Sequence, residues 1–134
     1  MGNSGNNNKA PTVLIADDSS EIRQLLRSSL MMCGCDVLDA VEDGEQALQQ
    51  LDNLKPDIVF LDIDMPNKGG IELLEIIKSK NIEVFPVIIS GYSTIDNLKA
   101  AMGSGAQGFV VKPYTQGKIQ EVITKYIQTL RDNN

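Results

Sequence analysis

Short apolar runs and longer amphipathic segments alternate along the chain from residue 12 onward. The apolar runs are rich in Val, Ile and Leu, and they predict strands at 12–16, 36–40, 57–62, 84–90 and 108–111. The segments between them repeat apolar residues three or four positions apart and predict helices at 19–33, 44–54, 71–80, 93–105 and 115–130. Because the strands are continuous apolar runs, we expect an α/β fold of five βα units, with a doubly wound parallel sheet covered on both faces.

The predicted helices carry local start and stop signals. Asp18 and Asp43 are expected to cap the first two helices, which Gly34 and Pro56 are expected to end. The apolar face expected on the first helix consists of Ile22, Leu25, Leu26 and Leu30. The broader stripe expected on the last helix consists of Ile119, Val122, Ile123, Tyr126, Ile127 and Leu130.

The length of 134 residues fits one domain with a real core. Residues 1–10 are rich in Asn and Gly and have no apolar face, so we expect a disordered tail there. The folded domain is expected over 11–131, followed by a short tail at 132–134.

Charge and composition exclude several classes of function. The net charge of −6 argues against nucleic acid as the partner of this domain. The apolar runs are too short to span a membrane, and no charged-then-apolar leader is visible, so we expect a cytoplasmic protein with no membrane contact. With no His and only two Cys, Cys33 and Cys35, a zinc site lacks ligands and His-based acid–base catalysis is removed. The chemistry must therefore use Asp, Ser, Lys, a bound ion or a partner's groups.

In the stretch IVFLDIDMP, the apolar residues of a predicted strand are followed directly by Asp62. An ionised carboxylate is expensive to bury unless something pairs with it. Ligands of doubly wound sheets bind outside the carboxyl ends of the strands. The polar groups that follow strand ends in this sequence are Asp17, Asp18, Asp62, Ser90 and Lys112.

Three carboxylates about 5 Å apart would repel by roughly 3 kcal/mol per pair at an effective dielectric near 20. A hard divalent cation with oxygen ligands relieves this repulsion, and Mg²⁺ fits best. Lys112 would relieve more of it. The pattern therefore predicts an acidic pocket with a cation at this edge of the sheet.

These residues occur together with "DMP" and Gly70 after the third strand, Gly91 after Ser90, and "GFVVKP" at the fifth strand. In order and spacing the chain resembles response-regulator receiver domains of two-component signalling over about residues 11–130. The resemblance implies a (βα)5 flavodoxin-like fold with strand order 2-1-3-4-5. It also implies a signalling domain rather than a turnover enzyme.

The resemblance assigns roles to individual residues. Asp62 resembles the phosphoacceptor, which takes a phosphoryl group from the phosphohistidine of a sensor histidine kinase or a phosphotransfer protein. Asp18 resembles a direct Mg²⁺ ligand, Asp17 a ligand either directly or through water, and the backbone carbonyl of Asp64 is expected to complete the metal site with Asp62. Lys112 is expected to pair with the phosphoryl oxygens.

Further roles concern switching and lifetime. Ser90 is expected to hydrogen-bond the phosphoryl group, and the peptide bond from Lys112 to the following proline is expected to be cis. Phe109 matches the aromatic residue that moves inward on activation, so we expect a target protein to dock on the fourth helix, fifth strand and last helix. Tyr92 is bulky enough to slow hydrolysis of the aspartyl phosphate, whereas Asp64 could repel a donor or orient the water. Gly69, often a polar residue in the family, is expected to loosen its turn.

Other interpretations exist for each residue taken alone. Asp17 and Asp18 could cap a helix, Lys112 could be a solvated lysine, Ser90 could belong to a turn, and Phe109 could be a core residue. These readings would all have to hold at once.

Two rival functions belong to other classes. The LDIDMP stretch also resembles the nucleophile motif of haloacid-dehalogenase-type phosphatases, which would use Asp62 and Asp64. Against this, Pro66 stands where that family has Thr or Val, and the partner acids precede the motif. A receiver-like module that no longer takes phosphate is the second rival. Whether the domain is free-standing, a relay intermediate or part of a longer protein stays open.

Overall fold

The structure, a computed structural model, describes residues 9–91 and 94–132. Within these ranges strands and helices alternate strictly along the chain. The strands are β1 (Thr12–Ala16), β2 (Asp36–Val41), β3 (Ile58–Asp62), β4 (Phe85–Ser90) and β5 (Gly108–Val111). The helices are α2 (Ser20–Met32), α3 (Gly44–Leu54), α4 (Gly70–Ser79), α5 (Ile95–Gly103) and α6 (Gln116–Asp132). Every predicted element is present, and its ends differ from the prediction by at most two residues.

Three predictions fall wholly or largely outside the described residues. They are the disordered tail at 1–10, the short tail at 132–134 and the role of Tyr92. They stay predictions.

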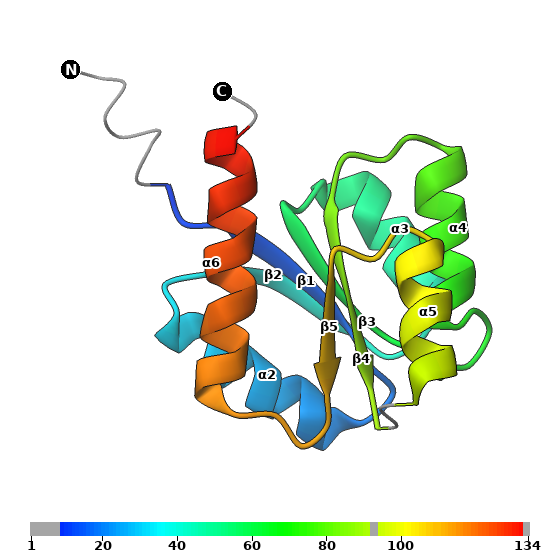
Figure 1. Cartoon of the computed structure of the whole chain (residues 1–134), viewed down its shortest axis with the longest axis horizontal. Helices are drawn as coiled ribbons and strands as arrows, with labels where there is room; N and C mark the ends of the chain where they lie inside the picture. Colours follow the sequence, from blue (N-terminus) through cyan, green and yellow to red (C-terminus); the bar gives the residue numbers. More distant parts are fainter. Residues whose placement is uncertain (1–8, 92–93, 133–134) are drawn as a thin grey trace.

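The five strands form one parallel sheet in the order β2-β1-β3-β4-β5, which confirms the predicted doubly wound topology. Helices α2 and α6 cover one face, and α3, α4 and α5 cover the other (Figure 1). Because all strands are parallel, their carboxyl ends meet at one edge of the sheet, toward which the strand arrowheads point (Figure 1).

The two faces of the sheet form two separate hydrophobic cores, and the strands contribute side chains to both. Alternate residues of β3 show the division: Phe60 packs with α2 and α6, whereas Val59 and Leu61 pack with α3 and α4, and all three are fully buried. Burying a side chain of this size contributes about 1.5–3 kcal/mol. This double burial explains why the central strands read as continuous apolar runs.

Some predicted core positions are wrong. Leu25 on α2 is 53% exposed, and Leu130 near the end of α6 is 47% exposed. On α2 the buried residues Leu26 and Leu30 lie four apart, so the sheet covers a narrower stripe than the sequence pattern suggested. No helix of the described ranges combines the length and hydropathy that a membrane crossing needs.

Candidate functional site

The turn after β1 presents the first two aspartates in different ways. Ser19, not Asp18 as predicted, caps α2: its side chain accepts a hydrogen bond from the Ile22 N–H at 3.3 Å. Its own N–H donates to Asp17 Oδ1 at 2.9 Å. Asp17 is therefore held in the turn and fully buried, whereas Asp18 is exposed and its carboxylate is left out of the cap.

Asp62 is the last residue of β3 and is 4% exposed. The backbone N–H of Asp64 donates to Asp62 Oδ1 at 3.2 Å. On the opposite side, the N–H of Ile63 donates to the carbonyl of Ile89 on β4 at 2.9 Å. Asp62 is thus held between a central strand and the first turn of the loop that follows it.

Carboxylate oxygens of Asp17, Asp18 and Asp62 all lie within 4.8 Å of one another. The Lys112 ammonium, at the end of β5, lies 2.9 Å from Asp17 Oδ2 and 3.5 Å from Asp62 Oδ2. The sequence-predicted acidic pocket is therefore present in the structure, with one cation from the chain beside two of its three carboxylates. Asp64 lies beside it, with its side chain exposed.

The pocket raises the pKa of Asp62 to about 6. Burial is the largest cause, and the Asp17 carboxylate adds to it, while the Lys112 ammonium and the Asp64 N–H oppose it. Burial alone would lower the pKa of Lys112, but the Asp17 and Asp62 carboxylates outweigh burial and raise that pKa. At pH 7 the pocket therefore holds an ionised but energetically unfavourable Asp62 carboxylate beside a charged lysine.

Ser90 and Phe109 occupy the neighbouring strands. Ser90 ends β4 and is fully buried, and its carbonyl accepts a hydrogen bond from the Lys112 N–H at 2.8 Å. Phe109 on β5 is half-buried and packs against the core on the α3, α4 and α5 side. The peptide bond between Lys112 and Pro113 is cis, as expected.

The donor set fits a hard divalent cation. Three carboxylates converge, and the buried Asp17 Oδ2 has no properly directed hydrogen bond among the described residues, although Lys112 lies close. A buried carboxylate oxygen that has an ion pair but room for a further partner, beside two other carboxylates, is what an oxygen-liganded cation satisfies.

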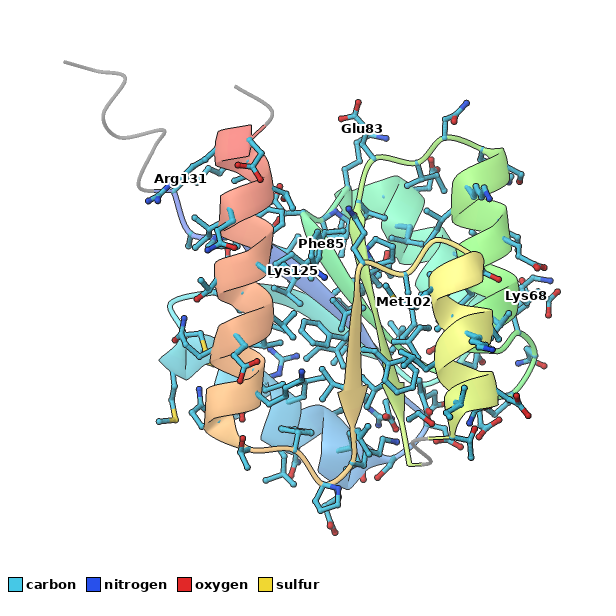
Figure 2. The ribbon with its side chains drawn as sticks, in the orientation of Figure 1. Lys68, Glu83, Phe85, Met102, Lys125 and Arg131 are labelled. Carbon is cyan, nitrogen blue, oxygen red and sulfur yellow. The ribbon has the colours of Figure 1, made fainter. Side chains whose placement is uncertain are left out.

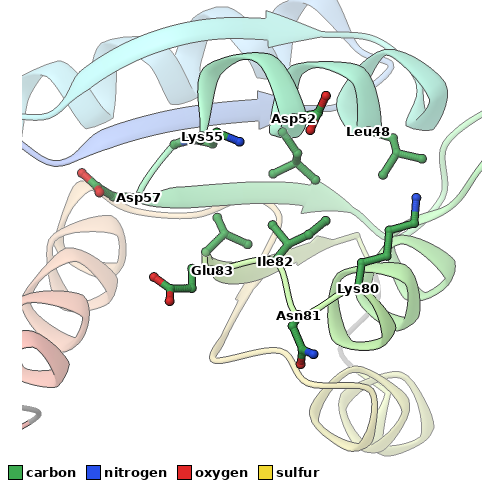
Figure 3. A pocket seen from close by; sticks show the side chains of 11 residues that line it. Leu48, Asp52, Lys55, Asp57, Lys80, Asn81, Ile82 and Glu83 are labelled. Atoms are coloured by element: carbon green, nitrogen blue, oxygen red, sulfur yellow. The ribbon is translucent and has the colours of Figure 1, made fainter.

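A groove of about 810 Å³ opens at the opposite end of the sheet, at the starts of β3 and β4 (Figure 3). Its lining mixes charged residues of both signs, Lys55, Lys80, Asp52 and Glu83, with apolar residues such as Ile82 (Figure 3). None of the predicted site residues that the structure describes lines it. The groove and the carboxylate cluster thus lie at opposite ends of the strands.

Sequence reasoning missed groups that support the site. The Arg23 guanidinium donates to the Asp17 carbonyl at 2.7 Å, so it braces the turn that carries Asp17 and Asp18. Its position six residues after Asp17 is the only sequence signal, and it becomes readable only once the strand and helix are known to meet there. A Cβ on Gly69 would lie 2.8 Å from the Ile63 carbonyl oxygen, so glycine permits a close approach of the two backbones here. That Gly69 loosens its turn stays a prediction.

Comparisons with known proteins agree with this fold. The family model described as the response regulator receiver domain matches residues 13–124. The chemotaxis protein CheY of Bacillus subtilis is 31% identical over 116 residues, which are 87% of this chain and 97% of CheY. The transcriptional regulatory protein PrrA of Mycobacterium tuberculosis is 31% identical over 110 residues, which are 82% of this chain but 47% of PrrA. This chain thus spans about half the length of the PrrA proteins that it matches.

Solved structures give the same result. The receiver domain of the Francisella response regulator 1452 superposes with a TM-score of 0.81 at 30% identity, covering 89% of this chain and 98% of that one. The CheX–CheY–BeF3–Mg²⁺ complex of Borrelia burgdorferi gives a TM-score of 0.80 at 31% identity, covering 84% and 86% of the two chains. The parallel fold and the acidic strand edge define a signalling domain of the two-component type. The chain belongs to the response regulator receiver domain family.

Proposed function

We propose that Asp62 is the phosphoacceptor, and that it takes a phosphoryl group from the phosphohistidine of a sensor histidine kinase or a phosphotransfer protein. The observation that carries this proposal is the position of its carboxylate: it ends a buried strand, within 4.8 Å of the Asp17 and Asp18 carboxylates and 3.5 Å from the Lys112 ammonium. The ionised form of a buried carboxylate is expensive, and the raised pKa of Asp62 shows that Lys112 offsets this cost only in part.

In the transfer, one carboxylate oxygen of Asp62 forms a bond to phosphorus while the P–N bond of the donor's phosphohistidine breaks. The electron pair of the broken P–N bond stays on the donor's imidazole nitrogen. The imidazole leaves in its neutral form, either because its other nitrogen already carries a proton or because it takes one from solvent. Because the pKa of Asp62 is about 6, its carboxylate is mostly ionised at pH 7 and can act as the nucleophile. The charge of the Lys112 ammonium favours approach of the anionic phosphoryl group.

Mg²⁺ fits the donor set described above, with Asp17, Asp18, Asp62 and the backbone carbonyl of Asp64 as its ligands. When bound, the ion supplies positive charge that stabilises phosphoryl oxygens during transfer. The chain's own part is to hold the ligands in place: Ser19 and Arg23 fix the turn at Asp17, and the Asp64 N–H orients the Asp62 carboxylate.

After transfer, Lys112 and Ser90 are positioned to bind the phosphoryl oxygens. Charge-assisted hydrogen bonds of this kind contribute about 1.5–3 kcal/mol each. Together they approach the roughly 5.5 kcal/mol that moves a two-state element from 1:99 to 99:1. Phe109, three residues before Lys112 on β5, is the side chain we propose to move with them.

The docking surface for a target protein is proposed on α5, β5 and α6. The exposed face of α5 carries an apolar stripe with helical spacing, formed by Ile95, Leu98 and Met102, which are 69%, 43% and 46% exposed. This stripe lies on the helix that follows Ser90 and precedes Phe109, so movement at either residue would be transmitted to it.

The phosphatase alternative is not favoured. Its mechanism needs a second acid beside the nucleophile, yet the Asp64 side chain is exposed and does not belong to the carboxylate cluster found among the described residues. We therefore propose a phosphoprotein that hydrolyses slowly rather than a turnover enzyme, with the domain spanning 11–131. Its cytoplasmic location stays a prediction.

Incubation with acetyl phosphate and Mg²⁺ tests the proposal by intact-protein mass spectrometry. Wild type should gain one phosphoryl group, and Asp62→Asn should gain none. Asp52→Asn, an exposed aspartate on α3, is the matched control and should label as wild type does. A phosphoryl group retained in Asp62→Asn would show that another residue is the nucleophile.

A further inference from the structure

The loop between β3 and α4, residues 63–69, is fastened to the first turn of α3. The Asn67 side-chain amide donates to Asp43 Oδ2 at 3.1 Å, while Asp43 Oδ1 caps α3 by accepting from the Gln46 N–H at 2.9 Å. Both oxygens of this one carboxylate are thus used, one for the helix and one for the loop. Asn67 has a φ of 69°, a left-handed conformation that Asn tolerates better than most residues.

A backbone bond and an ion pair join the same two segments. The N–H of Gly44, which begins α3 and has no partner inside the helix, donates to the Pro66 carbonyl at 3.3 Å. The Lys68 ammonium lies 3.3 Å from Glu45 Oε1 and 3.7 Å from Glu72 Oε2. Figure 2 shows Lys68 on the outside of the molecule, on the side of α4.

Gly44 leaves no room between the helix and the loop. A Cβ at this position would overlap the Lys68 carbonyl oxygen and lie 2.5 Å from Lys68 Cβ and 2.8 Å from the Lys68 carbonyl carbon. Two of these three atoms belong to the backbone, so a side chain on residue 44 would have to push the loop itself. In contrast, a Cβ on Gly117, in the first turn of α6, would meet nothing closer than 3.8 Å.

The other side of the loop is packed onto the end of β3. Gly70 donates its N–H to the Ile63 carbonyl at 3.2 Å, and a Cβ on Gly70 would lie 2.7 Å from the Asp62 carbonyl oxygen. The loop is therefore closed between the strand end that carries Asp62 and the helix start that carries Gly44. A displacement at Lys68 is therefore expected to shift residues 64–67 as well, and the N–H of Asp64 donates to Asp62 Oδ1.

We propose that the first turn of α3, Asp43 to Glu45, is a positioning element for the metal and phosphoacceptor site, acting through residues 66–68 on the Asp64 backbone. We name these three residues the α3 latch. The proposal rests on the proposed function, because it needs Asp62 and the Asp64 carbonyl at the ion. None of the three latch residues touches the reacting atoms, so each is a positioning residue and not a catalytic one.

Gly44→Ala tests the latch, with calorimetric Mg²⁺ affinity as the readout and no phosphoryl donor present. We expect affinity to fall about 10-fold, the lower end of what is lost when groups that orient metal ligands are changed. Alanine is a better helix former than glycine, so this loss cannot come from a weakened helix. Gly117→Ala is the matched control and should keep wild-type affinity.

Asn67→Gly supplies a second variant in case Gly44→Ala does not fold. Glycine accepts the left-handed backbone but lacks the amide that holds Asp43. Its Mg²⁺ affinity should fall in the same direction. Asn81→Gly, another left-handed Asn at the far end of the sheet with a φ of 53°, is its control.

Loss of affinity must be separated from general loss of stability. Ile123→Val destabilises the core on the α6 side, away from the loop, and should leave Mg²⁺ affinity unchanged. If its affinity falls as far as that of Gly44→Ala, the latch is only a structural feature and the proposal is overturned.

Asp18→Ala separates failure of the latch from failure of the proposed function. If Asp18→Ala loses Mg²⁺ affinity while Gly44→Ala and Asn67→Gly keep it, the latch alone is overturned. If Asp18→Ala also keeps wild-type affinity, the metal site itself is wrong, and the latch falls with it.

Discussion

The Lys112 ammonium lies closer to Asp17 than to Asp62, at 2.9 Å against 3.5 Å. Both carboxylates are buried, at 0% and 4% exposed, so the Lys112 ammonium lies unequally between two groups that water barely reaches. If Asp62 takes a phosphoryl group as proposed, the Lys112 ammonium has to divide its charge between Asp17 and the new anionic group. The resting ion pair with Asp17 would then contribute to the energy difference between the unphosphorylated and phosphorylated states.

The first prediction concerns Lys112→Met in the absence of divalent ions. Removing one partner of a largely buried ion pair leaves Asp17 and Asp62 repelling each other, and we expect a loss of about 3 kcal/mol in the free energy of unfolding. Added Mg²⁺ should restore part of this, because it binds only the native state. Urea denaturation with and without Mg²⁺ measures both effects.

Lys118→Met is the control for that measurement. Lys118 lies 3.9 Å from Glu121 in an exposed pair on α6, and its loss should change stability by less than about 0.5 kcal/mol. If Lys112→Met and Lys118→Met lose equal free energy of unfolding, the buried ion pair contributes no more to stability than the exposed one.

The second prediction follows from the pKa of Asp62, about 6 against an ordinary value of 3.8. Between these two values the native state binds more protons than the unfolded state, so native stability without metal should fall as pH rises from about 4 to about 6. Above pH 6 the ionised carboxylate costs up to about 3 kcal/mol. Asp62→Asn should therefore stabilise the metal-free protein by about 2 kcal/mol at pH 8 and by little at pH 4.

Urea denaturation in a chelator over this pH range measures the effect. If the difference in the free energy of unfolding between Asp62→Asn and wild type is the same at pH 4 and pH 8, the raised pKa is contradicted. Asp52→Asn, at an exposed position, should show no such pH-dependent difference.

The fold was predictable from the sequence because burial on both faces makes strands readable as apolar runs. The end of α2 was readable too, since Gly34 has a φ of 83° directly after the cap. Its start was not, because Asp18 and Ser19 are adjacent and both are good capping residues; only the path of the turn decides that Ser19 accepts the bond. Helical periodicity likewise placed Leu25 on an apolar face without saying how much of that face the sheet covers.

The candidate site also has contacts that the sequence could predict and contacts that it could not. The meeting of Asp17, Asp62 and Lys112 follows from the rule that parallel strands end at one edge, so it could be read from strand ends alone. The hydrogen bond between Asn67 and Asp43 could not be predicted. The two residues lie 24 positions apart, and their contact depends on how the loop passes over the start of α3. Sequence patterns therefore predict where strands end much better than they predict the paths of loops.

The third prediction concerns switching. Saturating a Mg²⁺-loaded sample with beryllofluoride, a mimic of the phosphoryl group, should move backbone amide signals around Phe109 and along α5, β5 and α6. Signals of β2, at the far edge of the sheet, should move least. Heteronuclear NMR measures both. Shifts confined to the ends of β1 and β3 would show that binding is not transmitted to the proposed docking surface.

The fourth prediction concerns Tyr92, whose role rests on the sequence. A bulky side chain two positions after Ser90 would cover the path of the water that hydrolyses the aspartyl phosphate. Tyr92→Ala should therefore shorten the lifetime of the phosphorylated protein, measured by the decay of its mass after the donor is removed. Tyr92→Phe, which keeps the bulk, should decay as wild type does. An alanine variant that decays no faster would remove Tyr92 from this role.

The last prediction separates two roles for Asp64, whose side chain is exposed while its N–H holds Asp62. Asp64→Asn keeps the backbone donor and removes one negative charge beside the proposed phosphoacceptor, Asp62. If the carboxylate repels anionic donors, the variant should be phosphorylated faster by acetyl phosphate, and the gain should shrink as ionic strength rises, because salt screens interactions between exposed charges, with a Debye length of about 10 Å at 0.1 M.

If instead the Asp64 carboxylate orients the attacking water, Asp64→Asn should change the decay of the phosphorylated protein and leave its formation untouched. Both rates come from one mass-spectrometric time course, with donor present and then removed. We expect the first result, since an exposed carboxylate acts at a distance through its charge, whereas orienting a water requires a fixed position that the described contacts of this side chain do not provide. A variant that forms the phosphorylated protein at the wild-type rate in low salt would contradict repulsion.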